Sequence, residues 1–377
     1  MNISPVRELE YHFHRLDMIK MEISQTLKNN KSLILLLLGI IFFIVYLYAL
    51  NVDLRYILEK LYKINLLYIP LVLLVDILFI LTYSVAWFIL IKIVCPQIEM
   101  KDSILIVIVG WFGDMLIPAA FITGEALRLI LLKKHYSLDM SKAAATVVIH
   151  RLLNAMAFLF YITTGLIMLS ISHESMNSRI FYQSLVILIL SLIGLFIALS
   201  LLKRIYLLRE FVKKIGRALF IFLREKNSKI EEKIDNFFNS FEFSLRVMKK
   251  YRATILGSFL ILLLQWSLGV AIPYLFFLAV GYRNISFWTL SVAYPIYSLM
   301  DNIPLGIPAN AGALDIAMIS TFVVLGVPKE IATLVTLLTR SVIVVFEALL
   351  TGSISIVYLS KTFKEISWRN LKALFTE

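Results

Sequence analysis

Two short stretches interrupt the long apolar runs of this sequence. Residues 114–125 read DMLIPAAFITGE, and residues 301–312 read DNIPLGIPANAG. Each stretch begins with an aspartate and contains proline and glycine, which break helices because proline lacks an amide hydrogen and glycine loosens the backbone. Irregular backbone at membrane depth is tolerated only where it contacts protein or a water-filled cavity. The two stretches therefore predict two breaks within membrane-embedded helices.

A short apolar helix is predicted after each break, over Ala126–Leu132 and Ala313–Leu325. Neither helix has the roughly 20 residues that are needed to span a bilayer. We therefore expect two re-entrant helical hairpins, over residues 103–134 and 289–327.

The composition places the whole chain in a membrane. It has 377 residues, of which 60% are apolar and 16% are charged, whereas a soluble domain has about 45–50% apolar and about 25% charged residues. These values exclude a soluble globular protein, a disordered chain and a disulfide scaffold. Cys95 is the single cysteine, so neither an intrachain disulfide nor a Cys-based metal site can form. The net charge of +12 favours a basic surface facing anionic lipid over nucleic-acid binding.

The remaining apolar runs predict an all-α polytopic protein with about six full spans. They cover residues 32–50, 65–93, 143–169, 182–202, 253–280 and 329–358. Residues 1–31 mix charges of both signs, so the first span is predicted to be a retained anchor and not a cleaved signal peptide. We expect two transmembrane halves, 32–202 and 253–360, joined by a linker over residues 203–252.

The distribution of positive charge predicts the orientation. Residues 203–252 carry fourteen Lys and Arg against six acidic residues, and the tail 361–377 is also basic. The positive-inside rule places this linker and both termini in the cytoplasm of a plasma-membrane protein. The first hairpin would then enter from the cytoplasm and the second from outside. Apolar residues recur in the linker at helical spacing opposite basic ones, which fits either helices on the membrane surface or simple topology determination.

The two hairpins share the features of one unit repeated in opposite orientations. Matching residues lie 187 to 189 positions apart: Asp114 with Asp301, Gly124 with Gly312, and Arg151 with Arg340. Inverted repeats with broken helices are typical of alternating-access transporters, whose substrate site lies at the repeat interface near the membrane midplane.

The start of each short helix is a candidate anion site. Amide groups at a helix N-terminus carry partial positive charge and bind phosphate, and Thr123 and Asn310 are the predicted N-caps. The alternative is structural: the glycines only permit close helix crossings, while Glu125 and Asp315 satisfy the helix ends.

Charged side chains within the spans are costly, at about 2.5–3.5 kcal/mol each, and are usually functional. Arg151 and Arg340 are two such residues, and Asp114 and Asp301 are their predicted ion-pair partners. The alternative is that the arginines bind a phosphate head group in bidentate fashion.

Three further groups within the spans are candidates for a structural or pathway role. Glu347 follows Arg340 by seven residues, on the same helix face, and His150 is expected to face a cavity. Asp76 is predicted to be either a pathway residue or a cap at the outer end of its span.

The first break resembles a segment of a known family. Pro118, Gly124-Glu125 and Arg128 are similar to the Pro…Gly-Glu…Arg segment of the lysylphosphatidylglycerol synthase transmembrane region, often called the flippase-like domain.

The second break resembles another segment of the same family, Pro-Gly-Gly-x-Gly-x-x-Glu. Here Pro308 and Gly312 match, Ala309 or Asn310 replaces a glycine, and Asp315 replaces the glutamate. The connector Gly326-Val-Pro328 and Arg340 also fit, and the resemblance covers about residues 30–360.

The resemblance implies a flippase that moves an anionic or phosphate-bearing lipid, in some members a modified one, between membrane leaflets. The ligand would be a phospholipid or a polyprenyl-phosphate-type lipid. We expect the stand-alone transmembrane module, so that any lipid-modifying enzyme would be a separate partner chain. The expected substrate-binding residues are Gly124, Glu125, Arg128, Arg151, Asn310, Gly312, Asp315 and Arg340. The expected structural or pathway groups are Asp114, Asp301, His150 and Glu347.

Two other functions stay open at this point. One is a small-solute secondary transporter driven by protons through Asp114, Asp301 and Glu125. The other is a non-transporting membrane partner of a lipid-modifying enzyme. The sequence has no HExxH, P-loop or dinucleotide motif and no Ser-His-Asp set, so we expect neither an enzyme nor a cofactor or metal site.

Overall fold

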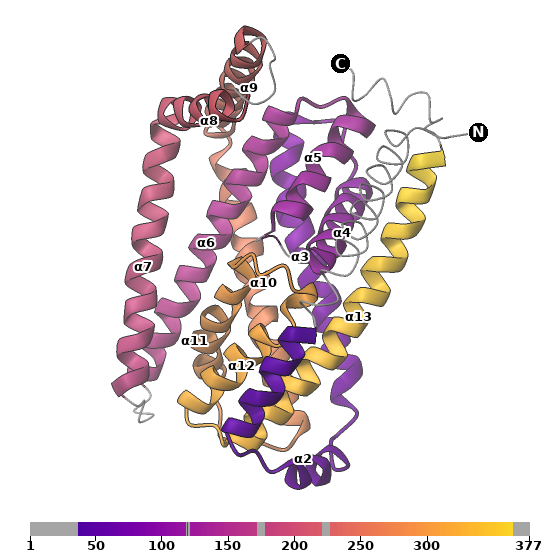
Figure 1. Ribbon diagram of the computed structural model, residues 1–377, viewed down its shortest axis with the longest axis vertical. Helices are drawn as coiled ribbons and strands as arrows, with labels where there is room; N and C mark the ends of the chain where they lie inside the picture. The colour runs from indigo at the N-terminus through magenta and orange to yellow at the C-terminus, as the bar shows by residue number, and fades with distance from the viewer. Residues whose placement is uncertain (1–36, 118, 120, 172–177, 221–226, 365–377) are drawn as a thin grey trace, which may run out of the picture.

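The computed structural model describes residues 37–364 except 118, 120, 172–177 and 221–226, and these residues are mainly helical (Figure 1). No β-strand occurs among them. Five of the described helices are long and apolar enough to cross a membrane, or up to six if a bent pair counts as one span. The predicted all-α polytopic class is therefore confirmed.

Five long helices form the body of the bundle, and they correspond to five of the six predicted spans. They are α3 (Tyr68–Val94), α6 (Met140–Ile171), α7 (Ser178–Lys203), α10 (Arg252–Ala279) and α13 (Lys329–Lys364). In the apolar stretch Leu185–Lys203 of α7, no residue is buried by the described protein. This helix therefore offers most of its surface to lipid.

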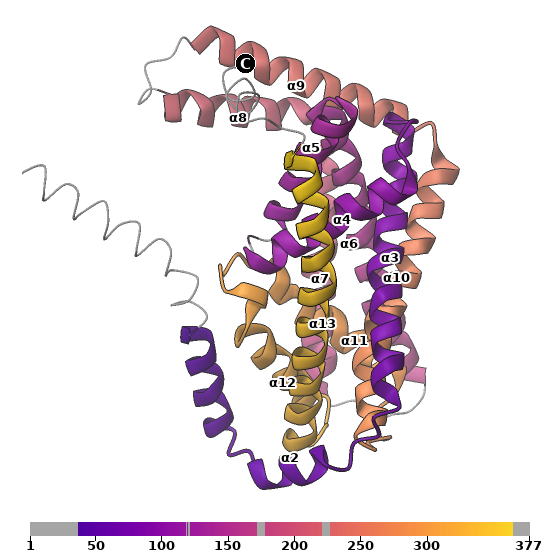
Figure 2. The same ribbon diagram turned by 90° about the vertical axis from the view of Figure 1, so that its right-hand side faces the viewer.

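The predicted first span is only partly described. Its described part is the helix Leu37–Ala49, which is followed by α2 (Leu54–Leu61) at an angle of 105°. Asp53 caps α2 by accepting hydrogen bonds from the amides of Arg55 and Tyr56. Figure 2 shows α2 lying across one end of the bundle, so the chain turns there before entering α3.

The linker between the two halves contains two helices, α8 (Ile205–Phe220) and α9 (Asn227–Met248), which lie across the other end of the bundle (Figure 2). They are joined by an ion pair in which Lys213 Nζ lies 2.7 Å from Asp235 Oδ1. Helix α9 packs against α6, and its Phe238 and Phe241 are buried, whereas Phe211 of α8 is exposed.

The first hairpin consists of α4 (Met100–Leu116) and α5 (Ile122–Tyr136). Both helices lie in the half of the bundle that carries α8 and α9 (Figures 1 and 2). Helix α5 is longer than the predicted Ala126–Leu132, because it starts within the break at Ile122 and continues to Tyr136. Pro118, on which the prediction of this break relied, lies outside the described residues.

The second hairpin lies in the opposite half of the bundle (Figures 1 and 2). It runs through α11 (Phe287–Ser298), two short 3₁₀ turns η1 (Leu299–Asn302) and η2 (Pro308–Asn310), and α12 (Ala313–Val324). The two hairpins thus lie in opposite halves of the bundle. Their entry from opposite sides of the membrane stays a prediction. A two-fold axis relating them stays a prediction.

A rigid frame supports both hairpins. Helices α3 and α10 pack along each other, and the Ser258 hydroxyl of α10 donates to the Ala86 carbonyl of α3 at 2.8 Å. Trp87 of α3 is fully buried and donates from Nε1 to Thr146 Oγ1 of α6 at 3.2 Å. These contacts fix the three helices on which α4, α5 and α11 pack.

Candidate functional site

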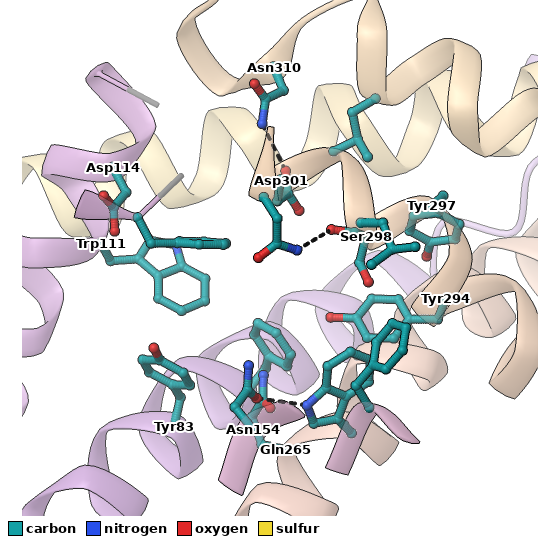
Figure 3. A pocket seen from close by; sticks show the side chains of 18 of the residues that line it. Tyr83, Trp111, Asp114, Asn154, Gln265, Tyr294, Tyr297, Ser298, Asp301 and Asn310 are labelled. Carbon is teal, nitrogen blue, oxygen red and sulfur yellow. Dashed lines mark hydrogen bonds between the residues drawn. The ribbon is translucent and has the colours of Figure 1, made fainter. Parts of the chain in front are cut away.

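A cavity of about 650 Å³ lies between the two hairpin breaks (Figure 3). Helix α4 contacts η2 directly, so the two breaks meet. The charged residues of the cavity lining are Asp76, Asp114, Arg128, Arg151, Asp301, Arg340 and Glu347. Its apolar lining includes residues of the lipid-facing helix α7, among them Gly194 and Ala198. The cavity can therefore take a charged group close to a membrane-exposed wall.

The first break is closed by a carboxylate at the start of α5. Phe121, the residue before the helix, has a left-handed backbone with φ of 66°. The amide of Gly124 donates to Asp114 Oδ1 at 2.7 Å, and Thr123 Oγ1 donates to the Ile117 carbonyl at 2.9 Å. Asp114 thus supplies the negative charge that a helix N-terminus attracts. The prediction of Thr123 as N-cap is wrong, because its hydroxyl points back to the end of α4.

Glu125 holds two arginines at this break. Its Oε1 lies 2.6 Å from Arg151 Nη2 and accepts from Arg151 Nε at 2.8 Å, while its Oε2 lies 3.4 Å from Arg128 Nη1. The Arg151 guanidinium also lies over the ring of Phe121, 4.4 Å from its centroid. One carboxylate on α5 therefore sets the positions of two cations.

Arg128 is the most deeply buried of the three cavity arginines. Its guanidinium lies 5.2 Å from the ring centroid of Tyr83 and 5.4 Å from that of Trp87, both on α3. Cation–π contacts of this kind compensate part of the cost of burying the charge. His150 is also fully buried, and its ring meets Tyr83 edge-on at 4.6 Å, behind the cavity wall and not in its lining.

The second break has a strained backbone. Ala309 and Asn310 have φ values of 51° and 50°, a region that residues other than glycine rarely adopt. The buried Asn310 side chain donates from Nδ2 to Asp301 Oδ1 at 3.0 Å (Figure 3). The prediction of Asn310 as the N-cap of α12 is therefore wrong. Its side chain joins η2 to η1 instead.

Asp315 serves both the start of α12 and the arginine of the following span. Its Oδ2 accepts from the amide of Gly312 at 2.6 Å, and its Oδ1 accepts from Arg340 Nε at 3.0 Å. Arg340 Nη2 also donates to the Ala309 carbonyl. The unusual backbone at Ala309 thus places a carbonyl oxygen on the guanidinium.

The predicted pairing of Asp114 with Arg151 and of Asp301 with Arg340 is wrong. In both halves the arginine pairs with the acidic residue on the helix after the break, Glu125 or Asp315. The aspartate before each break bonds within the break instead. Asp114 accepts from the Gly124 amide, Asp315 from the Gly312 amide, and Asp301 from the Asn310 side chain.

The two glycines of the predicted site provide close packing and do not line the cavity. A side chain at Gly124 would meet the Gly110 carbonyl at 2.5 Å and the Asp114 carboxylate. A side chain at Gly312, where φ is 83°, would overlap the backbone of Gly39 in the helix Leu37–Ala49. Glu125 and Asp315 are likewise absent from the lining and act on the cavity through the arginines that they hold.

Glu347 and Asp76 face the cavity from α13 and α3. Glu347 Oε2 accepts from Trp111 Nε1 of α4 at 3.1 Å. Asp76 is 1% exposed and lies within its helix, so the alternative of an outer-end cap is wrong.

Several polar cavity residues were not predicted. Gln265 lines the cavity from α10, and Asn154 of α6 accepts from Trp266 Nε1 at 2.8 Å (Figure 3). Trp111 and Tyr294 add polar ring groups. A sequence signal for them existed: Gln265 and Asn154 are polar residues in otherwise apolar spans, and such residues can be expected to face a cavity just as the charged ones are.

The base of the first hairpin is tied to the end of α13. Lys134 Nζ donates to the Thr362 carbonyl at 2.5 Å, and the Tyr136 hydroxyl donates to Asp102 at the start of α4. Burial and the hydrogen bond to Asp102 raise the pKa of Tyr136. At the other end of α13, Lys329 Nζ donates to the Asn51 carbonyl at 2.6 Å. Both ends of α13 are thus held against other segments.

The sequence comparisons agree with this architecture. A family described as the lysylphosphatidylglycerol synthase TM region matches residues 34–351. The chain belongs to this family. The match includes both hairpins and all seven charged groups of the cavity lining.

Similar proteins occur in several archaea. A UPF0104 membrane protein of Methanocaldococcus jannaschii is 27% identical over 322 residues, which cover 84% of this chain and 91% of the relative. One of Pyrococcus horikoshii is 26% identical over 327 residues, covering 82% and 92%. One of Methanothermobacter thermautotrophicus is 24% identical over 286 residues, covering 75% and 82%. These relatives support a multi-pass membrane protein.

Proposed function

We propose that this protein moves an anionic or phosphate-bearing lipid between the two membrane leaflets, with the head group bound in the central cavity. One observation carries the proposal: Arg151 and Arg340, which follow the first and the second hairpin, face the same cavity. Because the two arginines come from opposite halves of the bundle, a phosphate head group would meet a guanidinium on both sides of the hairpin breaks.

Both arginines keep donors for a ligand. Their side chains are 28% and 18% exposed, although each sits in an ion pair. A guanidinium has five N–H donors in a planar fork that matches phosphate oxygens. Within the described residues, Arg340 forms hydrogen bonds from Nε and Nη2 only. The Nη1 donors can therefore bind a phosphate without breaking the pair with Asp315.

The acidic partners orient the arginines. Glu125 and Asp315 each sit on the first turn of a hairpin helix, so their positions are fixed by the break. A charge-assisted hydrogen bond at fixed geometry preorganises the guanidinium for a second anion. The pairs therefore favour a ligand with dispersed negative charge, such as a phosphodiester.

The cavity wall formed by α7 suggests where the acyl chains of the lipid lie during transport. Ser191, Gly194 and Ala198 of this helix line the cavity, and a side chain added at Gly194 would contact nothing within 4 Å. Since α7 faces lipid along its apolar part, chains can stay in hydrocarbon while the head group crosses. The family description, which refers to a lipid synthase, supports a lipid ligand.

We further propose the setting of this activity. The end that carries α8, α9 and most of the basic charge faces the cytoplasm of a plasma-membrane protein, by the positive-inside rule. The protein would act as a transporter without a chemical step, so it would not be an enzyme and would need no cofactor. A lipid-modifying enzyme would be a separate partner.

A leaflet-asymmetry assay in proteoliposomes tests the proposal. The probes are a labelled phosphatidylglycerol, a labelled polyprenyl phosphate and, as a neutral control, a labelled phosphatidylcholine. We expect the protein to speed exchange of at least one anionic probe between leaflets and to leave phosphatidylcholine at the protein-free rate. Exchange of every probe at the protein-free rate would contradict the proposal.

The same preparation separates the alternatives. Proton-dependent uptake of a small solute without lipid movement would favour the solute transporter. Co-purification with a lipid-modifying enzyme, with no lipid movement by the pure protein, would favour the non-transporting partner.

A further inference from the structure

Two carboxyl groups of the cavity have no role in the head-group site as proposed so far. Asp76 projects from α3 and Glu347 from α13, and each is close enough to influence the other electrostatically. Both lie in helices that are long and apolar enough to cross a membrane. A carboxyl group at that depth is costly to keep and marks a functional path.

Asp76 is the more isolated of the two. Its side chain is 1% exposed, and neither carboxyl oxygen makes a hydrogen bond of good geometry within the described residues. Burying an ionised carboxylate without a partner costs far more than burying a neutral acid. Protonation of Asp76 removes this cost. Glu347 is the nearby carboxylate that can share the proton with Asp76.

Glu347 is held by one donor from the first hairpin. Trp111 Nε1 of α4 donates to its Oε2 at 3.1 Å. The indole itself is fixed by edge-on contacts with Phe79 and Tyr83, at ring-centroid distances of 5.8 and 5.5 Å. Two carboxyl groups that share one site inside the protein cannot both ionise without a cation nearby.

The groups around the pair supply one cation. Tyr294 of α11 and Asp301 of η1 influence the pair, and Gln265 of α10 lines the same cavity with its buried Oε1 unpartnered among the described residues. The cation is Arg340 of α13, which acts on Glu347 and is itself paired with Asp315. Arg128 and Arg151 face the cavity from α5 and α6, where Glu125 holds both.

We propose that Asp76 and Glu347 form a proton-binding site that couples lipid movement to the proton gradient. The inference rests on the proposed lipid transport and names its energy source. When the pair carries one proton, Arg340 is free to bind a phosphate. When that proton passes to water on the side to which the cavity opens, the second negative charge competes for Arg340 and the head group leaves.

This exchange predicts symport of one proton with one anionic head group. The proton moves between a carboxyl oxygen and water, and no other bond changes. Because one pH unit corresponds to about 1.4 kcal/mol, a gradient of that size can shift the leaflet ratio of a coupled lipid by up to about tenfold.

The test imposes a pH gradient across proteoliposomes and follows labelled phosphatidylglycerol or polyprenyl phosphate, whichever the protein moves. The wild-type protein should accumulate the probe in the leaflet facing the alkaline side, and a protonophore should abolish this accumulation. Asp76→Asn and Glu347→Gln keep the shape of the protonated pair, so they should still equilibrate the probe but no longer accumulate it. Asp102→Asn, at the start of α4 and outside the cavity lining, is the matched control and should accumulate it like the wild type.

A second measurement does not depend on transport. Addition of the probe lipid to solubilised wild-type protein in weak buffer should cause uptake of about one proton per lipid bound, as expected for linked binding, and both cavity variants should show none. Accumulation that persists in both variants, or that follows a sodium gradient and ignores the pH gradient, would overturn the inference. Lipid movement that ignores the pH gradient would refute the proton site alone, whereas no lipid movement under any gradient would refute the proposed function itself.

Discussion

Arg340 and Asp315 form an ion pair that joins the last span to the tip of the second hairpin, with 3.0 Å between Nε and Oδ1. The other oxygen of the same carboxylate accepts the amide of Gly312 at 2.6 Å. Arg151 and Glu125 form the corresponding ion pair in the first half, with 2.6 Å between Nη2 and Oε1. A head group that binds these arginines would therefore contact groups fixed by both hairpin breaks.

Replacing the arginines by lysine should impair transport. Arg340→Lys or Arg151→Lys keeps the positive charge, but a lysine cannot hold the acidic partner and a phosphate through one planar fork. We expect each variant to lower the initial rate of lipid exchange by about tenfold or more, the effect of losing about 1.4 kcal/mol of binding. The leaflet-asymmetry assay measures this rate.

The matched control is Arg209→Lys in α8, which pairs with Asp235 far from the cavity. It should exchange lipid at the wild-type rate. If both cavity variants do the same, the arginines are structural charges only.

The double role of Asp315 predicts a difference in stability between two similar substitutions. Asp315→Asn weakens the cap of α12 and the pair with Arg340 together, whereas Asp114→Asn affects the cap of α5 and leaves the pair of Arg151 with Glu125 in place. We expect the first to destabilise the protein by about 1–3 kcal/mol, the cost of a lost charged hydrogen bond, and the second by less. Thermal melting in detergent measures both, and equal midpoints for the two variants would count against the double role of Asp315.

Close packing at the first break predicts that Gly124→Ala is harmful. The new methyl group would meet the Gly110 carbonyl at 2.5 Å and the Asp114 carboxylate. Overpacking of this kind costs about 1–3 kcal/mol, so the melting midpoint should fall. Gly257→Ala in α10 is the control, because its methyl group would meet only Ile89 Cδ1 at 3.7 Å. Similar melting of the two variants would show that the hairpin is less tightly packed than described here.

The charge distribution predicts which end of the bundle is cytoplasmic. In a background that lacks the buried Cys95, Tyr62→Cys and Tyr206→Cys place exposed thiols at opposite ends. A membrane-impermeant thiol reagent applied to intact cells should label the first and spare the second. The reverse pattern would invert the orientation of both hairpins.

Much of the fold follows from the sequence because long apolar runs and Pro–Gly breaks are local signals. Five spans and both hairpins lie where such signals placed them, and Asp114 and Asp301 do lie at the breaks. The ion pairs were assigned wrongly because partner choice depends on depth and helix rotation. Glu125 and Asp315 sit on helices that return towards the arginines, and spacing along the chain does not reveal this.

The cavity could be predicted only in part. Arg151, Arg340 and Glu347 stood out as charges in apolar spans, whereas the contact of Trp111 with Glu347 joins residues 236 positions apart. Likewise, the packing of Gly312 on Gly39 depends on where the helix Leu37–Ala49 docks. Such relationships arise from tertiary packing and have no local signature.

Photo-crosslinking with a head-group-labelled phosphatidylglycerol or polyprenyl phosphate tests the central claim most directly. The account predicts adducts on cavity-lining peptides, such as those containing Leu152 or Asn302, and loss of these adducts in the Arg340→Lys variant. Adducts confined to lipid-facing positions such as Leu190 of α7, with the same yield in the variant, would contradict a head-group site between the two hairpin breaks.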